Sequence, residues 1–352
     1  AAASPLDAQQ PSGLTAAAQV VRAYDAITDA RFDEVHLERT CPPAPREVCQ
    51  LLEAVSLWWQ IQLDPVNRSR DTEFESRIDG AIDATEGWAR REPRRAEAWF
   101  YVGGAYGARA QWRVLRSQQL GAARDGKRIK DVLEKALALD PRLQEAYFGI
   151  GLYRYYADVA PAAAKVLRWL LLLPGGDRVD GLRQMLRARD AGQLLRDEAD
   201  FQLQVIYLWY EHKVPEALAL LRGLRARRPH NPLFLQLIAE TEDTYVHDVT
   251  ASLRTWQALL DALAAGDVEL ARRNYRELLA DHPEWRQSPL TEIGTLISSA
   301  NPRAALARMK ALRSPAYLMA APEAAAPHRP AVSIRSGSDV PEVVGLKLDL
   351  SA

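Results

Sequence analysis

Residues 99–112 read WFYVGGAYGARAQW and residues 133–141 read LEKALALDP, and these two stretches decide the fold. In both, apolar side chains recur every three or four residues, which is the period of one face of an α-helix. The proline that closes the second stretch cannot continue a helix, because it lacks the backbone N–H and its ring clashes with the preceding turn. The sequence therefore predicts two consecutive helices that pack together through small residues such as Gly103 and Ala136.

The same helical period extends outward from these stretches, from Leu14 to about Ser314. Strand-like alternation of apolar and polar residues is absent from this region of the sequence. Proline-containing breakers mark where successive helices are predicted to end: Asp64-Pro65, Glu92-Pro93, Asp140-Pro141, Arg228-Pro229, His282-Pro283 and Ser314-Pro315. An all-α fold built from repeated helix–turn–helix units is therefore predicted.

The residues resemble the tetratricopeptide family, whose repeat of ~34 residues carries W-x2-L-G-x2-Y in one helix and A-x3-F, then proline, in the next. The residues that match lie in successive units: Trp99, Val102, Gly103, Tyr106, Leu133, Ala136 and Pro141; Tyr147, Ile150 and Gly151; Phe201, Leu208, Ala217, Leu221 and Pro229; Ala271, Tyr275 and Pro283. The resemblance covers roughly residues 70–315 and implies a right-handed α-solenoid. It also implies tight contacts between helices at five small residues: Gly103, Ala136, Gly151, Ala217 and Ala271.

Two segments depart from the family pattern. The long spacing between Tyr106 and Ile129 predicts longer helices or an inserted turn around residues 118–126. Residues 157–200 fit no unit cleanly. Within them, the apolar run from Trp169 to Pro174 is interpreted as a buried helix, with contact to a membrane or a partner as the alternative, and Asp177 is predicted to cap the next helix.

The sequence divides into four parts: a flexible N-terminus (1–13), N-terminal capping helices with a Cys-Pro loop (14–69), tetratricopeptide-like repeats (70–315) and an extended tail rich in proline and alanine (316–352). Two short pieces of the tail have β propensity, so either a flexible end or strand pairing is open there.

Charge and hydropathy exclude two broad classes. The 45 basic and 46 acidic side chains give a net charge of -1, which argues against a general nucleic-acid-binding protein. The longest apolar run, which ends at Pro174, is far shorter than the ~20 residues that span a bilayer, so no transmembrane segment is predicted.

The two cysteines, Cys41 and Cys49, lie in the proline-rich stretch CPPAPREVC. A bent loop of this length brings two cysteines within disulfide reach, and the bond would stabilise the chain by about 2–3 kcal/mol; two free thiols are the alternative. Residues 1–13 read like the N-terminus left by signal-peptide removal, or like a trimmed chain. Both features favour a periplasmic or otherwise exported bacterial protein.

No catalytic or metal-binding motif stands out. The six histidines are far apart and form no HExxH pattern, and the glycines of residues 103–107 lack the Lys-Ser/Thr of a phosphate-binding loop. The prediction is a non-enzymatic protein without a metal or cofactor.

The resemblance implies that particular positions of the first helix of each unit line a concave surface: Phe100, Gly104 and Gly107; Phe148, Leu152 and Tyr155; Gln202, Ile206 and Trp209. Two interpretations remain open. The positions form an open aromatic groove that docks a peptide, a partner protein or the chain's own tail (322–350), or a further helix layer covers them and they are core.

The functional prediction is a protein–protein interaction scaffold of the cell envelope. The alternative, from a different class, is an enzyme or small-molecule-binding protein with an aromatic pocket around residues 153–156 and 209–212.

Overall fold

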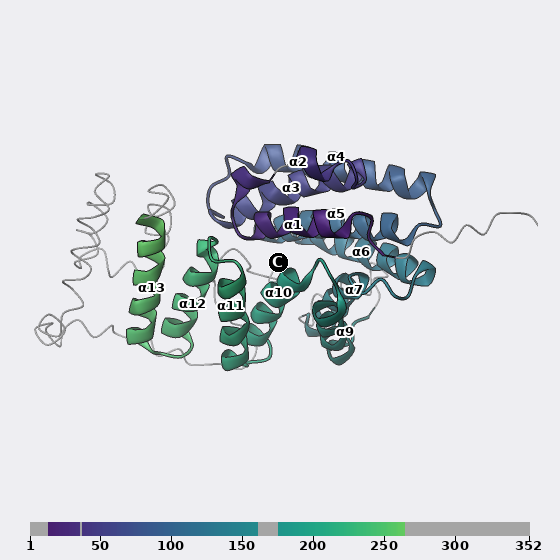
Figure 1. The fold of residues 1–352 in the computed structure, drawn as a ribbon. Helices are drawn as coiled ribbons and strands as arrows, with labels where there is room; N and C mark the ends of the chain where they lie inside the picture. The colour runs from purple at the N-terminus through teal and green to yellow at the C-terminus, as the bar shows by residue number, and fades with distance from the viewer. Residues whose placement is uncertain (1–12, 36, 161–174, 265–352) are drawn as a thin grey trace, which may run out of the picture. The chain divides into compact units, whose positions relative to one another are not determined.

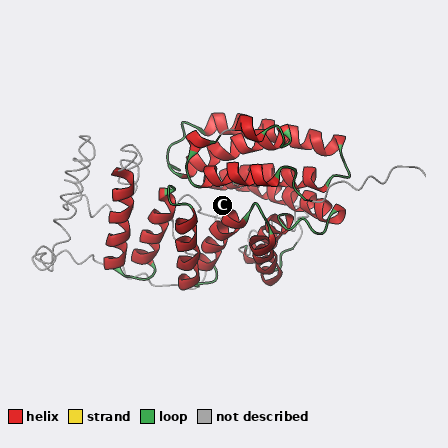
Figure 2. Cartoon of the chain, viewed as in Figure 1, coloured by secondary structure: helices red, strands yellow, loops and turns green. Residues whose placement is uncertain are grey.

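The computed structural model describes residues 13–35, 37–160 and 175–264, and these residues are built from helices and connecting turns (Figure 1). No strand occurs within these ranges, which confirms the all-α prediction for the part of the chain that is described (Figure 2). The predicted tail (316–352), the apolar run at 169–174 and the contact at Ala271 lie outside the described residues.

The N-terminal region contains α1 (Ala17–Thr28), a short 3-10 helix (Phe32–Glu34) and α2 (Leu37–Thr40). The helices that follow pack in adjacent pairs: α3 (Arg46–Gln62) with α4 (Asp71–Arg91), α5 (Ala96–Leu115) with α6 (Gln119–Leu139), α7 (Ala146–Val159) with α9 (Arg178–Ala191), and α10 (Arg196–Trp209) with α11 (Val214–Arg227). We call the first helix of each pair its A helix.

The described chain divides into two compact units, and the boundary between them along the chain lies between Arg228 and Pro229. The first unit contains all the helices named so far. The second unit contains α12 (Pro232–Thr244) packed against α13 (Val249–Ala264). The boundary falls inside the predicted repeat region, and a right-handed solenoid running through it stays a prediction.

Helix ends follow the proline signals of the sequence. Helices α4, α6 and α11 end at Arg91, Leu139 and Arg227, each two residues before a proline. The predicted cap also forms, because the Asp177 carboxylate accepts a hydrogen bond from the backbone N–H of Asp180, 2.9 Å away. The long first spacing is taken up by long α5 and α6 helices, with a turn at residues 116–118 between them.

Small residues let paired helices approach closely, as predicted. A Cβ atom at Gly103 of α5 would lie 2.6 Å from the Leu133 side chain of α6. A Cβ atom at Gly151 of α7 would lie 2.6 Å from the carbonyl oxygen of Gly181 in α9. Ala136 and Ala217 are fully buried. A larger side chain at Gly103 would have to displace the Leu133 side chain, and one at Gly151 would meet backbone atoms of α9.

Candidate functional site

The structure places most of the predicted groove residues in the interior. Gly107, Leu152 and Trp209 are half-buried and Gly104 is exposed. The other five are buried, with these exposed fractions: Phe100 4%, Phe148 7%, Tyr155 0%, Gln202 5% and Ile206 0%. The interpretation of these five as an open aromatic groove is therefore corrected, and the alternative that they are core describes them.

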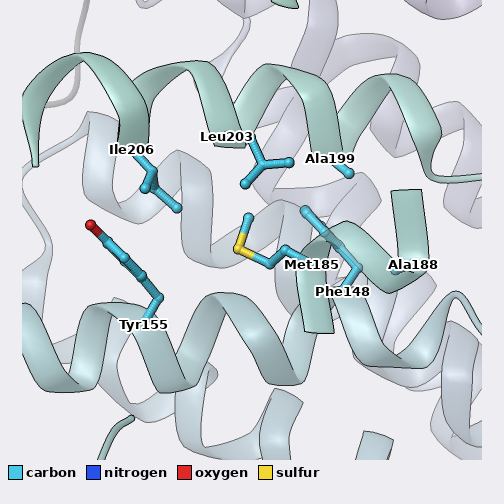
Figure 3. Packing of buried hydrophobic residues seen from close by; sticks show 7 residues of the cluster. All are labelled: Phe148, Tyr155, Met185, Ala188, Ala199, Leu203 and Ile206. Atoms are coloured by element: carbon cyan, nitrogen blue, oxygen red, sulfur yellow. The ribbon is translucent and has the colours of Figure 1, made fainter. Parts of the chain in front are cut away.

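The physical reason is the packing of α10 against α7 and α9. Phe148 and Tyr155 from α7 face Met185 from α9 and Leu203 and Ile206 from α10 (Figure 3). Each of these side chains fills space between helices that belong to different pairs. A partner cannot contact them without separating the helices.

A repeated pattern that the sequence analysis did not use fixes the register of the third unit. The motif Glu-Ala-x-Phe occurs at residues 97–100, 145–148 and 198–201, at or near the start of α5, α7 and α10. It aligns Phe201 with Phe100 and Phe148, which differs by one residue from the register predicted for the third unit. The motif itself was the available signal, and it makes Phe201 rather than Gln202 the equivalent position.

The three glutamates of this motif are all buried, with exposed fractions of 4% for Glu97, 5% for Glu145 and 6% for Glu198. A buried carboxylate needs hydrogen-bond donors, because its desolvation otherwise costs several kcal/mol. Glu145 accepts its bond from the backbone N–H of Gln193, at 2.6 Å, in the link between α9 and α10. The other two bind the N-terminal segment of the chain.

Helix α1 and the residue before its N-cap reach side chains of two A helices. The backbone N–H and the hydroxyl of Thr15 donate to the Glu97 carboxylate of α5, at 2.6 and 2.8 Å. The hydroxyl of Tyr24 donates to Oε2 of Glu198 in α10, at 3.1 Å. The apolar face of α1 packs on α3. We call the side chains of α3, α5 and α10 that α1 covers the α1-binding surface.

Glu198 is a buried carboxylate of this surface that accepts hydrogen bonds from three side chains. Its other carboxylate oxygen accepts from the amide groups of Gln111 in α5 (3.1 Å) and Gln202 in α10 (3.3 Å). All three described partners are neutral. Burial therefore raises the pKa of Glu198, and burial together with Glu198 raises the pKa of Tyr24 well above its ordinary value.

The two arginines that follow one another near this site, Arg227 and Arg228, pair with aspartates and not with Glu198. Arg228, which follows α11, pairs with Asp25 of α1 and, at 2.6 Å, with Asp197 beside Glu198. Arg227 also binds Asp197, at 2.7 Å. Tyr24 of α1 is thus held by a neutral network, whereas the next residue, Asp25, is held by an ion pair.

The second candidate region, residues 153–156 and 209–212, forms an aromatic cluster. The rings of Tyr155, Tyr156 and Tyr210 pack edge to face, with centroids 5.6–6.0 Å apart. The Tyr155 hydroxyl donates to Oε1 of Glu211 at 2.6 Å, and Arg178 donates to both oxygens of that carboxylate, each at 2.7 Å. Hydrogen bonding from Arg178 lowers the pKa of Glu211, and burial raises the pKa of Tyr155.

Cys41 and Cys49 form a disulfide with their Cα atoms 5.9 Å apart, which is the pairing that the sequence predicted. The bond ties the end of α2 to the first turn of α3, the helix on which α1 packs. It therefore fixes the segment that connects α1 to the paired helices.

Within the described ranges, no group of three or more histidine, cysteine or acidic side chains is placed to hold a metal ion. No helix in the same part of the chain is long and apolar enough to cross a membrane. No protein-family model and no curated protein matches the sequence. The described part of the chain is all-helical, with helices that pack in adjacent pairs, and the assignment to the tetratricopeptide family stays a prediction.

Proposed function

We propose that this chain is a non-enzymatic scaffold that binds a peptide or a partner protein through the A-helix face of its first unit. The observation that carries the proposal is the docking of α1. One short segment lies against helices of separate pairs and is held at both ends by side-chain hydrogen bonds or ion pairs. Arrays of helical hairpins present extended surfaces of this kind, so the step from fold to binding is by analogy.

The proposal places the protein in an oxidising, exported compartment. The disulfide between Cys41 and Cys49 supports this, because such bonds persist mainly outside the cytoplasm. Thiol labelling of the unreduced protein recovered from its cells tests the point. Protection of both cysteines is expected, and full labelling of both would contradict export.

Partner binding is tested by photo-cross-linking with benzoylphenylalanine at single glycines. Gly104 on the A helix α5 is exposed, and Gly80 on the second helix α4 is also exposed, so the two serve as a matched pair. A discrete cross-linked partner from the producing cells is expected at Gly104 and not at Gly80. Equal products at both positions, or products at Gly80 alone, would rule out the A-helix face.

A small-molecule site or an enzyme centred on Tyr155 remains the alternative of a different class. The contacts favour it less. Tyr155 is completely buried, and the Glu211 carboxylate already accepts hydrogen bonds from Tyr155 and Arg178. The groups that would do the chemistry thus bind one another.

A further inference from the structure

The way α1 is bound has the form of a ligand helix in a receptor groove. The apolar side chains buried by α1 are Val20, Ala23, Tyr24, Ala26 and Ile27. Val20, Ala23 or Tyr24, and Ile27 follow one another at intervals of three or four residues, and Val20 and Ile27 are completely buried. This is the spacing with which amphipathic helices dock in hydrophobic grooves. The opposite face carries Arg22, which is exposed.

The polar contacts of α1 make a short recognition code. A hydroxyl and a backbone N–H at Thr15 bind Glu97, and Arg95 donates to the same hydroxyl at 2.6 Å. Further along, the phenol of Tyr24 binds Glu198, and the carboxylate of Asp25 pairs with Arg228. The surface that binds this segment therefore has two carboxylates, Glu97 and Glu198, that accept hydrogen bonds from it, and one cation, Arg228, that pairs with an acidic residue.

The receptor groups need an occupant of that chemistry. Glu97 and Glu198 are buried acids. Removing α1 together with Thr15 would take the Tyr24 donor from Glu198 and the two Thr15 donors from Glu97, and would leave Glu97 with Arg95 alone and Glu198 with its two amide donors. Such a surface is stable with α1 or with another helix that supplies the same donors. Its polar groups penalise an occupant that lacks them.

Resting on the proposed function, we propose that α1 is a displaceable resident of the α1-binding surface, and that the partner binds there through an amphipathic helix. The partner helix presents a Thr or Ser near its start, and a tyrosine followed by an acidic residue about two and a half turns later. It takes the hydrogen bonds of Glu97 and Glu198 and the ion pair of Arg228. While α1 is docked, it competes with the partner and lowers the apparent affinity.

The test uses the full chain and a fluorescent peptide of residues 13–31, GLTAAAQVVRAYDAITDAR. Binding is measured by fluorescence anisotropy to the wild type and to the double variant Thr15→Ala/Tyr24→Phe. The variant weakens the resident helix but keeps Glu97, Glu198 and Arg228. We expect the peptide to bind the variant about tenfold or more tightly than the wild type, since each lost hydrogen bond is worth roughly a factor of five.

Peptide variants test the code. Tyr24→Phe and Asp25→Asn in the peptide are each expected to weaken binding about fivefold or more, while Arg22→Gln on the exposed face leaves it unchanged. Circular dichroism and melting of both chains verify that the variant is folded; if it is not, the single variant Thr15→Ala takes its place. Equal binding of the peptide to both folded chains, or equal binding of all four peptides, overturns the inference.

Two further outcomes are decisive. Concentration-dependent dimers of the folded variant, seen by light scattering, would identify α1 of a second copy as the occupant and overturn the partner-helix version. A peptide that does not bind, together with a specific cross-link at Gly104, would overturn this inference and leave the proposed scaffold function standing.

Discussion

A glutamate at each end of α10 accepts a hydrogen bond from a tyrosine of another helix, but the two glutamates have different electrostatic surroundings. Near its start, Glu198 accepts a hydrogen bond from Tyr24; just after its end, Glu211 accepts one from Tyr155. Glu198 has two neutral amides as further partners, whereas Glu211 has the guanidinium of Arg178. The pKa of Glu198 is raised by burial, and the pKa of Glu211 is lowered by its hydrogen bond from Arg178.

The comparison distinguishes two contacts. We call the contact between Tyr155 and Glu211 the fixed junction, and the contact between Tyr24 and Glu198 the changeable junction. Tyr155 belongs to the cluster that joins α7, α9 and α10, and its partner Glu211 is paired with the guanidinium of Arg178. Tyr24 belongs to α1, and its hydroxyl is one of three neutral donors to Glu198. A buried acid with neutral partners is sensitive to the loss of any donor, so we expect the Glu198 junction to respond most to small changes.

The largest expected effect on stability comes from a substitution at the contact between α7 and α9, the helices that support the fixed junction. A Cβ at Gly151 would lie 2.6 Å from the Gly181 carbonyl oxygen and 2.9 Å from the backbone nitrogen of Met185. Backbone atoms cannot give way as a side chain does. Gly151→Ala is therefore expected to lower the free energy of unfolding by about 2–3 kcal/mol, measured by urea unfolding.

Gly104→Ala is the matched control on the equivalent helix. Gly104 is exposed, and the nearest atom to its Cβ would be in the Leu51 side chain, at an ordinary distance of 3.5 Å. The substitution is expected to stabilise the protein by about 0.5–1 kcal/mol, because alanine favours the helix. Destabilisation by both changes to a similar extent would show that the α7–α9 contact is not special.

Much of the local structure could be predicted from the sequence because its causes are local. Proline fixes the ends of α4, α6 and α11, and small residues at Gly103 and Gly151 mark close helix contacts. Both signals depend only on neighbours along the chain or on the partner helix of the same pair. The disulfide of Cys41 is predictable for the same reason.

The candidate site was harder to predict because burial depends on distant segments. Tyr155 is covered through α9 and α10, and Glu198 is satisfied through α1, which lies far away in sequence. An aromatic residue on a helix face has the same pattern whether a solvent-filled groove or another helix lies over it. The Glu-Ala-x-Phe motif was visible in the sequence, but only the structure shows that its acids bind the N-terminal segment.

The second prediction compares the two tyrosine hydroxyls directly. Tyr24→Phe leaves one oxygen of buried Glu198 without its described donor, so a loss of about 1–3 kcal/mol is expected. Tyr155→Phe leaves Glu211 with both bonds from Arg178, so a loss near 1 kcal/mol is expected. Urea unfolding of both variants at pH 7 measures the difference. A larger loss for Tyr155→Phe would reverse the assignment of the fixed and changeable junctions.

The third prediction concerns pH. The raised pKa of Glu198 means that its contribution to stability is full below the ordinary glutamate pKa of 4.5 and is lost as the pH rises through the raised value. The lowered pKa of Glu211 means the opposite: its contribution is present above 4.5 and is lost as the pH falls through the lowered value. Unfolding free energies are compared for Glu198→Gln, Glu211→Gln and the wild type across this range.

Relative to the wild type, Glu198→Gln is expected to gain stability as the pH rises from 4.5. Glu211→Gln is expected to recover relative to the wild type as the pH falls below 4.5. Each unit of pKa difference corresponds to about 1.4 kcal/mol between the two plateaus. Parallel curves for the three proteins would show that the two acids have similar settings after all.

The smallest expected effect is that of salt, and it sharpens the comparison most directly. Arg178 is 46% exposed, so its pair with Glu211 is screened by added salt. A double-mutant cycle with Arg178→Gln and Glu211→Gln is expected to give a coupling of roughly 0.2–1 kcal/mol at low ionic strength, which falls toward zero at about 1 M salt. The cycle with Tyr24→Phe and Glu198→Gln joins two buried groups and is expected to keep its coupling over the same range, because ions do not reach it. A salt-dependent Tyr24–Glu198 coupling would mean that solvent and ions reach this contact. It would contradict the view that Glu198 is buried among neutral donors.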